Sequence, residues 1–248
     1  MAAETSTKGQ NRRSSKEGTT RSHNDDNIKA SEKVLSASVL ADAARVSVLD
    51  AEGRERQFED IYKPFDIGGK KRTLIIFVRH FFCGNCQEYI SALASSIPSP
   101  SLLPPDTSVA IVGCGAPSLI AMYTDVTHCP FPIYTDPSSR LYSLFGMTRT
   151  LDRGTYVPEH NQASLATLVL RGITQGLKRL FAGDMLKSGA MQQNGGELLF
   201  EAEFADATNS NDDRIKVNVP FCNIMQTTRD HSEISVLRAI LGLDEKEQ

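Results

Sequence analysis

Residues 74–86, LIIFVRHFFCGNC, join a run of large apolar side chains to a pair of cysteines. The apolar residues 74–78 are rich in β-branched side chains, which is typical of a central strand covered on both faces. From Cys83 to Ile97 apolar residues recur at steps of three and four, which predicts a helix. The sequence therefore predicts a buried strand that leads into a helix, with Cys83 and Cys86 at the start of that helix.

The alternation of strands and helices continues on both sides of this stretch. Strands that alternate with helices form a parallel sheet covered on both faces, and a closing hairpin adds antiparallel edge strands. The expected fold class is therefore α/β with the thioredoxin architecture: a central mixed sheet with helices on both faces, an N-terminal hairpin and an insertion in the middle. Ser232 is the expected N-cap of the last helix. The further elements that the pattern predicts are a short helix from residue 34, a hairpin within 46–58, strands at 108–113, 131–134, 197–203 and 215–219, and helices at 117–127, 138–145, 165–181 and 233–241.

The length of 248 residues is sufficient for one large domain or two small ones. Residues 1–32 are rich in Ser, Thr, Asn and charged side chains, and Ile28 is their only large aliphatic residue after the initial Met. Such a composition predicts a disordered tail. We expect one folded domain over residues 33–243 and a short C-terminal tail at residues 244–248.

The composition excludes several classes of protein. A net charge of −3 gives no electrostatic reason to expect a nucleic acid or an anionic membrane as a partner. No run approaches the roughly 20 apolar residues of a membrane span, and the N-terminus has neither the apolar core of a secretory signal nor the acid-poor composition of a transit peptide. Five cysteines are too few, and odd in number, for a disulfide-stapled secreted domain. We therefore expect a cytoplasmic protein with reduced thiols.

The cysteine pair lies where its chemistry can be predicted. At a helix N-terminus, unpaired N–H groups and the positive end of the macrodipole favour a thiolate over a thiol. Cys83 is the expected nucleophile, because the first cysteine of such a pair is the more exposed one. Cys86, one turn later, is expected to resolve a mixed disulfide or sulfenic acid on Cys83. Arg79 and His80 lie just upstream and complete the set of candidate catalytic residues, although a structural role for His80 stays equally open.

A CxxC pair is also half of a structural zinc site, which would require two further Cys or His ligands. His128, Cys129 and Cys222 form neither a second CxxC nor a His pair, so we expect no metal and no cofactor. The simplest interpretation of Cys114 and Cys222 is that they are small buried packing residues, and that of Cys129 is a loop thiol.

Residues 77–89, FVRHFFCGNCQEY, resemble the peroxiredoxin-like 2 family of AhpC/TSA-type antioxidant-like proteins, particularly its fungal members. The resemblance implies a thioredoxin-like fold with a peroxiredoxin-style insertion, formed by the strand at 131–134 and the helix after it. It also implies reduction of a peroxide or disulfide, with a thiol of the thioredoxin or glutathione type as the reductant. The likeness covers about residues 34–243 and returns at residues 131–137, 141–147, 192–198 and 227–234.

Three positions depart from the pattern of peroxiredoxins proper. Those enzymes place a Thr three residues before the reactive Cys and a Pro four residues earlier still, where this chain has His80 and Ile76. Their Arg near the later strand is absent at Gln193-Asn194, and Arg79 is a candidate substitute. Three function classes therefore stay open: a thiol oxidoreductase, a non-catalytic regulatory or interaction module, and a pathway enzyme acting on a small organic substrate beneath the helix at 165–181.

Overall fold

The computed structural model describes residues 35–66, 69–156, 158, 187–204 and 215–244. The expected N-terminal tail at 1–32, the helix at 165–181, the loop at 206–213 and all but the first residue of the C-terminal tail lie outside these ranges. The predictions made for those segments stay predictions.

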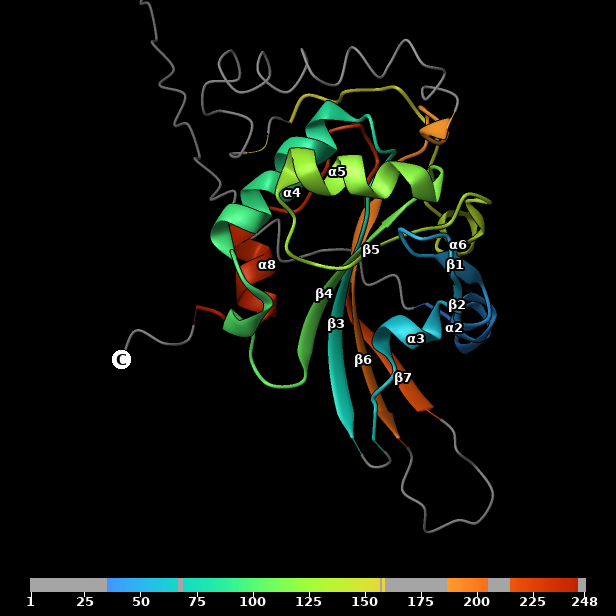
Figure 1. The fold of residues 1–248 in the computed structure, drawn as a ribbon, viewed down its shortest axis with the longest axis vertical. Coiled ribbons are helices and arrows are strands. Elements are labelled where there is room, and N and C mark those ends of the chain that lie inside the picture. Colours follow the sequence, from blue (N-terminus) through green and yellow to red (C-terminus); the bar gives the residue numbers. More distant parts are fainter. Residues whose placement is uncertain (1–34, 67–68, 157, 159–186, 205–214, 245–248) are drawn as a thin grey trace, which may run out of the picture.

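A seven-stranded mixed sheet forms the centre of the described part, with the strand order β2-β1-β5-β4-β3-β6-β7 (Figure 1). Strands β3, β4 and β5 are parallel, whereas β6 and β7 run antiparallel to them and the β1–β2 hairpin pairs with β5 at the other side. This arrangement confirms the α/β class and the thioredoxin-like architecture. The strands are β1 (Ser47–Leu49), β2 (Glu55–Gln57), β3 (Lys70–Phe77), β4 (Thr107–Gly113), β5 (Ile133–Thr135), β6 (Gly196–Phe204) and β7 (Ile215–Ile224).

Helices cover both faces of the sheet, as Figure 1 shows. One face carries α4 (Gly84–Ser96), α5 (Ile120–Thr127) and α8 (Ile234–Ile240), and the other carries α2 (Ala37–Ala44), α3 (Glu59–Tyr62) and α6 (Arg140–Leu144). Two short 3-10 helices, Pro100–Leu102 and Pro117–Leu119, precede β4 and α5. Within the described ranges, no helix is both long and apolar enough to cross a bilayer.

The apolar run of β3 is continuous because the strand supplies both cores at once. Leu74, Ile76 and Val78 belong to the core beneath α4 and α5, whereas Ile75 and Phe77 belong to the core beneath α2 and α6. Side chains of a strand alternate between its two faces, so a strand covered on both sides requires an apolar residue at every position. This burial fixes the end of β3, from which the chain enters α4.

Among the differences from the sequence prediction, two concern the end of β7 and the start of α8. Strand β7 continues past the expected end at residue 219, and Pro220 is tolerated because the strand lies at the sheet edge and the pairing shifts at this point. Ser232 is not the N-cap of α8: Glu233 occupies that position, without a side-chain cap hydrogen bond. The physical reason is that the Ser232 hydroxyl donates instead to Glu197 Oε2, at 3.0 Å.

Candidate active site

The candidate site lies at the carboxyl end of β3, where the chain turns into α4. The turn is anchored because the Val78 N–H donates to the carbonyl of Val112 at 2.9 Å, and the Tyr142 hydroxyl donates to the Val78 carbonyl at 2.8 Å. The start of β6 approaches the same point so closely that a Cβ atom at Gly195 would collide with the carbonyl oxygen of Phe77. The sequence stretch before β6 is therefore brought against the start of α4.

Cys83 is the N-cap residue of α4 and Cys86 lies in its first turn, as the sequence predicts. Both thiols are free. Cys83 is 4% exposed and Cys86 is 0% exposed, so the first cysteine is the more accessible one by a small margin. A substrate must therefore reach a largely covered sulfur.

Arg79 is fixed by the loop before β6 and directed at Cys83. Its Nη2 donates to the carbonyl of Met191 at 2.8 Å and its Nε donates to the carbonyl of Gln193 at 3.2 Å. The remaining terminal nitrogen, Nη1, lies 3.3 Å from Cys83 Sγ. Arg79 is 5% exposed, so this charge acts on the sulfur with little screening by water. The expectation that Arg79 substitutes for the missing arginine stays a prediction, which this contact with Cys83 supports.

The pKa values of the two thiols are shifted in opposite directions. The pKa of Cys83 lies well below its ordinary value, first because the Cys86 thiol donates a hydrogen bond to it and then because of the Arg79 charge, while burial opposes both effects. Burial and the neighbouring Cys83 sulfur hold the pKa of Cys86 well above its ordinary value. The backbone N–H of Arg79 lies 3.4 Å from Cys86 Sγ. Of the two thiols, Cys83 is therefore the one that loses its proton first.

His80 is buried beside the pair, and its Nδ1 has no hydrogen-bond partner among the described residues. Burial lowers the pKa of His80, and the Arg79 charge lowers it further while the Cys83 sulfur opposes this. Arg79 and His80 both lower the pKa of Cys83, and Arg79 is the larger contributor of the two.

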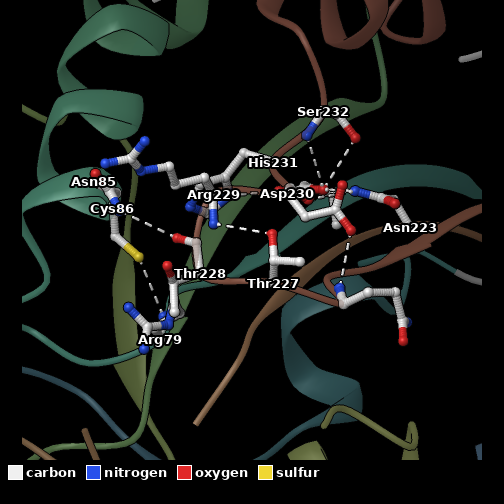
Figure 2. A network of polar contacts seen from close by, with 12 residues as sticks. Arg79, Asn85, Cys86, Asn223, Thr227, Thr228, Arg229, Asp230, His231 and Ser232 are labelled. Atoms are coloured by element: carbon white, nitrogen blue, oxygen red, sulfur yellow. Dashed lines mark hydrogen bonds and ion pairs between the residues drawn. The ribbon is translucent and has the colours of Figure 1, made fainter. Parts of the chain in front are cut away.

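The segment between β7 and α8 forms the other side of the site. The side-chain amide of Asn85 donates to the carbonyl of Thr228 at 3.2 Å and so ties this segment to the start of α4. Behind it lies a buried polar cluster, shown in Figure 2, in which Glu197 is the acceptor. The partners of its two oxygens are His231 Nδ1 at 2.9 Å, Asn223 Nδ2 at 2.7 Å and the Ser232 hydroxyl at 3.0 Å.

The cluster around Glu197 also supports α4 directly. The His231 ring stacks on Tyr89 with a centroid separation of 4.1 Å and an interplanar angle of 16°. Tyr89 is one helical turn after Cys86, so the thiol pair, α4 and the buried carboxylate form one connected unit. Considered alone, the residue pattern contains no signal that selects Glu197 or His231. The signal that could have indicated them is that both fall in stretches, 192–198 and 227–234, that resemble one family.

Cys114 and Cys222 are buried, in agreement with their interpretation as packing residues, and Cys129, expected to be a loop thiol, is buried as well. Cys114 Sγ donates to the carbonyl of Arg79 at 3.1 Å, and burial raises the pKa of this thiol. Burial raises the pKa of Cys129 to about 11. Among the residues placed by the structure, no group of three or more His, Cys, Asp or Glu side chains is arranged to hold a metal ion.

Comparison with known proteins identifies a family model and several relatives that match this chain. A family model described as AhpC/TSA antioxidant enzyme matches residues 92–206, a range that begins after both Cys83 and Cys86. Peroxiredoxin-like 2C of Mus musculus is 30% identical over 163 residues, which are 65% of this chain and 67% of the relative. Peroxiredoxin-like 2C of Takifugu rubripes is 24% identical over 211 residues, which are 83% of this chain and 83% of the relative.

Two solved structures align with most of the chain. The bacterioferritin comigratory protein of Xanthomonas campestris has a TM-score of 0.45 and 9% identity, covering 82% of this chain and 93% of its own. The peroxidoxin BcpB from Mycobacterium tuberculosis has a TM-score of 0.42 and 11% identity, covering 82% of this chain and 92% of its own. The assignment of the fold rests on the strand order of the sheet.

Proposed function

Because this chain belongs to the peroxiredoxin-like 2 family, a family of thiol oxidoreductases, we propose that it reduces peroxide or disulfide bonds with Cys83 and Cys86. One observation carries the proposal: Cys83 Sγ lies at the N-terminus of α4, 3.3 Å from the Arg79 guanidinium. A thiolate is the nucleophilic form of cysteine, and a helix N-terminus and an adjacent cation both favour it. The low pKa of Cys83 follows from this geometry and from the Cys86 hydrogen bond.

In the first half-reaction the Cys83 thiolate attacks one oxygen of a hydroperoxide or one sulfur of a disulfide. With a hydroperoxide, an S–O bond forms, the O–O bond breaks, the leaving alkoxide takes up a proton, and Cys83 becomes a sulfenic acid. With a disulfide, a new S–S bond forms at Cys83 and one thiolate leaves. This step reduces a hydroperoxide by two electrons, whereas a disulfide stays half reduced, with one half bound to Cys83, until the second thiol attacks.

In the second half-reaction Cys86 loses its proton and attacks the Cys83 sulfur. Water or the second thiolate leaves, and a Cys83–Cys86 disulfide forms. The hydrogen bond between the two thiols keeps Cys86 within reach of that sulfur. A thiol of the thioredoxin or glutathione type then returns two electrons and restores both cysteines. We place this cycle in the cytoplasm, where such thiols keep cysteines reduced.

The proposal is tested by the pH dependence of Cys83 alkylation with iodoacetamide. The reduced protein is followed by mass spectrometry, and Cys83→Ser defines the background from the other four thiols. We expect half-maximal reactivity below the free-thiol value of about 8.5. Reactivity centred at or above that value would show an unactivated thiol, and the non-catalytic regulatory module would then be the better function.

Turnover is tested separately with a thioredoxin system and a glutathione system, each with hydrogen peroxide, an organic hydroperoxide or a small disulfide. We expect Cys83→Ser to abolish consumption of the oxidant. We expect Cys86→Ser to accumulate a sulfenic acid or mixed disulfide on Cys83, because the resolving thiol is gone. If Cys86→Ser turned over as wild type does, the proposed resolving role would be wrong.

A further inference from the structure

Arg229 lies on the segment between β7 and α8, which is held against the start of α4. The Thr228 carbonyl accepts the hydrogen bond from Asn85 at 3.2 Å, and the Thr228 N–H donates to the carbonyl of Asp152 at 2.8 Å. These two bonds fix the backbone immediately before Arg229. Figure 2 shows the Arg229 side chain extending toward Asn85 and the first turn of α4. A long cationic side chain therefore stands at the rim of the thiol site.

No ion pair among the residues that the structure describes holds this cation, although the Glu88 carboxyl lies within electrostatic range of it. Arg72 and Arg238, in contrast, each pair with a carboxylate. Arg229 is half-buried, and its Nε is a buried donor without a hydrogen-bond partner in the described part of the chain. Burying a donor of a charged group without an acceptor costs free energy, so a ligand that supplies an acceptor is favoured here.

The carboxyl of Glu88 interacts with both Arg229 and the reactive sulfur. The carboxyl of Glu88 on α4 has a raised pKa, first because of burial and then because of Cys83, while Arg229 lowers it. Glu88 therefore lies within electrostatic range of both Arg229 and Cys83. The guanidinium of Arg79 is already occupied by two carbonyls and the Cys83 sulfur. Of these two arginines, Arg229 is the one whose guanidinium donates no hydrogen bond to a residue that the structure describes.

We propose that Arg229 binds the carboxylate of the substrate that reacts at Cys83, so that the protein prefers anionic peroxides or disulfides to neutral ones. This inference rests on the proposed oxidoreductase function and adds a specificity residue to it. A guanidinium forms two parallel hydrogen bonds with a carboxylate, and the N-terminus of α4 also favours a negative group. The carboxylate is held while the Cys83 thiolate attacks the bond to be reduced elsewhere in the same molecule.

The test compares matched charged and neutral oxidants on reduced full-length protein at physiological salt, which screens distant charges. The disulfide pair is 5,5′-dithiobis(2-nitrobenzoate) against the uncharged 4,4′-dithiodipyridine. The hydroperoxide pair is a fatty-acid hydroperoxide against its methyl ester. For each pair the measured quantity is the ratio of the two rate constants at Cys83, anionic over neutral, after subtraction of the rates of Cys83→Ser. Dividing by the neutral rate removes any change in the reactivity of the thiol itself.

We expect Arg229→Gln to lower the ratio about tenfold, as for the loss of a charge-assisted hydrogen-bonded pair. The ratio for Arg229→Lys should lie between those of wild type and Arg229→Gln, because lysine keeps the charge but cannot form the two parallel hydrogen bonds of a guanidinium. The matched control is Arg140→Gln on α6, an exposed arginine whose loss changes the net charge equally. The pair of oxidants whose ratio falls identifies whether the carboxylate belongs to a disulfide or to a hydroperoxide.

An equal ratio in Arg229→Gln and Arg140→Gln for both pairs of oxidants would overturn the inference and leave the oxidoreductase function standing. If Cys83 of the wild type reacted with none of the four oxidants, both proposals would be wrong. If Arg229→Gln does not fold, Glu88→Gln provides the test with Arg229 intact. Removing the neighbouring carboxylate should raise the ratio severalfold, and an unchanged ratio would contradict the inference.

Discussion

Replacing Arg79 by Met removes the positive charge that contacts Cys83 and leaves the burial of that sulfur in place. Two unit charges 3.3 Å apart attract each other by about 5 kcal/mol at an effective dielectric constant of about 20, which is an upper bound here because the guanidinium charge is spread over its nitrogens. Acids beside an arginine typically have a pKa lowered by about 1 to 3. We therefore expect the pKa of Cys83 to rise by a similar amount in Arg79→Met, and the alkylation rate at pH 7 to fall about tenfold or more.

The assay is the pH titration of Cys83 alkylation on reduced protein, with Arg79→Lys as the matched variant. Lysine keeps the charge but cannot hold the carbonyls of Met191 and Gln193 as a planar fork does. If the electrostatic reasoning is right, Arg79→Lys retains a Cys83 pKa below the ordinary thiol value although its folded state is less stable. The reasoning is refuted if Arg79→Met is folded and its Cys83 titrates where the wild-type thiol does.

Three further predictions concern the residues that support the thiol pair. Glu197→Gln should lower the free energy of unfolding in urea by about 3 kcal/mol or more, because it disrupts a fully buried hydrogen-bonded cluster. Glu201→Gln, which removes one partner of a partly exposed ion pair, should lower it by under about 1 kcal/mol. Gly195→Ala should be strongly destabilising, since its Cβ would collide with the carbonyl at the end of β3. A Cβ at Gly84 meets open space, so Gly84→Ala should change the melting temperature by only a few degrees. Similar melting temperatures for the two variants would argue against the close approach of Gly195 to β3. The free energy of unfolding of the reduced wild type should rise with pH from the lowered pKa of Cys83 to about 8.5, because in that window the unfolded state binds one more proton at this residue. Cys83→Ser should lack this slope, and parallel pH profiles of the two proteins would contradict the lowered pKa of Cys83.

The sequence predicts the part of the fold in which each local preference agrees with the tertiary environment. The apolar run before Arg79 identifies β3 because both faces of that strand are buried, and the helical period after Cys83 identifies α4 because one face of that helix packs on the sheet. The relation of Cys83 to the helix N-terminus follows from those two elements alone. For this reason the position of the thiol pair could be predicted from residue types and spacing.

The contacts that position the site could not be predicted in this way. Arg79 is held by backbone carbonyls of residues 191 and 193, and a carbonyl is present at every position of the chain, so no residue type marks them. Ser232 has the residue type of an N-cap, but the register that places Glu197 beside it directs its hydroxyl into the buried cluster. Such pairs form between residues far apart in the sequence, and single-residue preferences contain no information about them.

The residues that depart from peroxiredoxins proper have a structural explanation that also bears on function. Ile76 stands where those enzymes carry a proline, and here it pairs with Ile111 on one side and Glu197 on the other, in a strand enclosed by two neighbours. A proline at this position would remove a hydrogen-bond donor from the centre of the sheet, which such strands do not tolerate. Arg79, two residues after the end of β3, contacts the Cys83 sulfur, while the loop before β6 holds Arg79 and the segment between β7 and α8 holds Asn85. Differences in substrate between this chain and its relatives should therefore follow changes in those two segments, and exchanging residues 225–232 for the matching segment of a relative is the direct way to test that expectation.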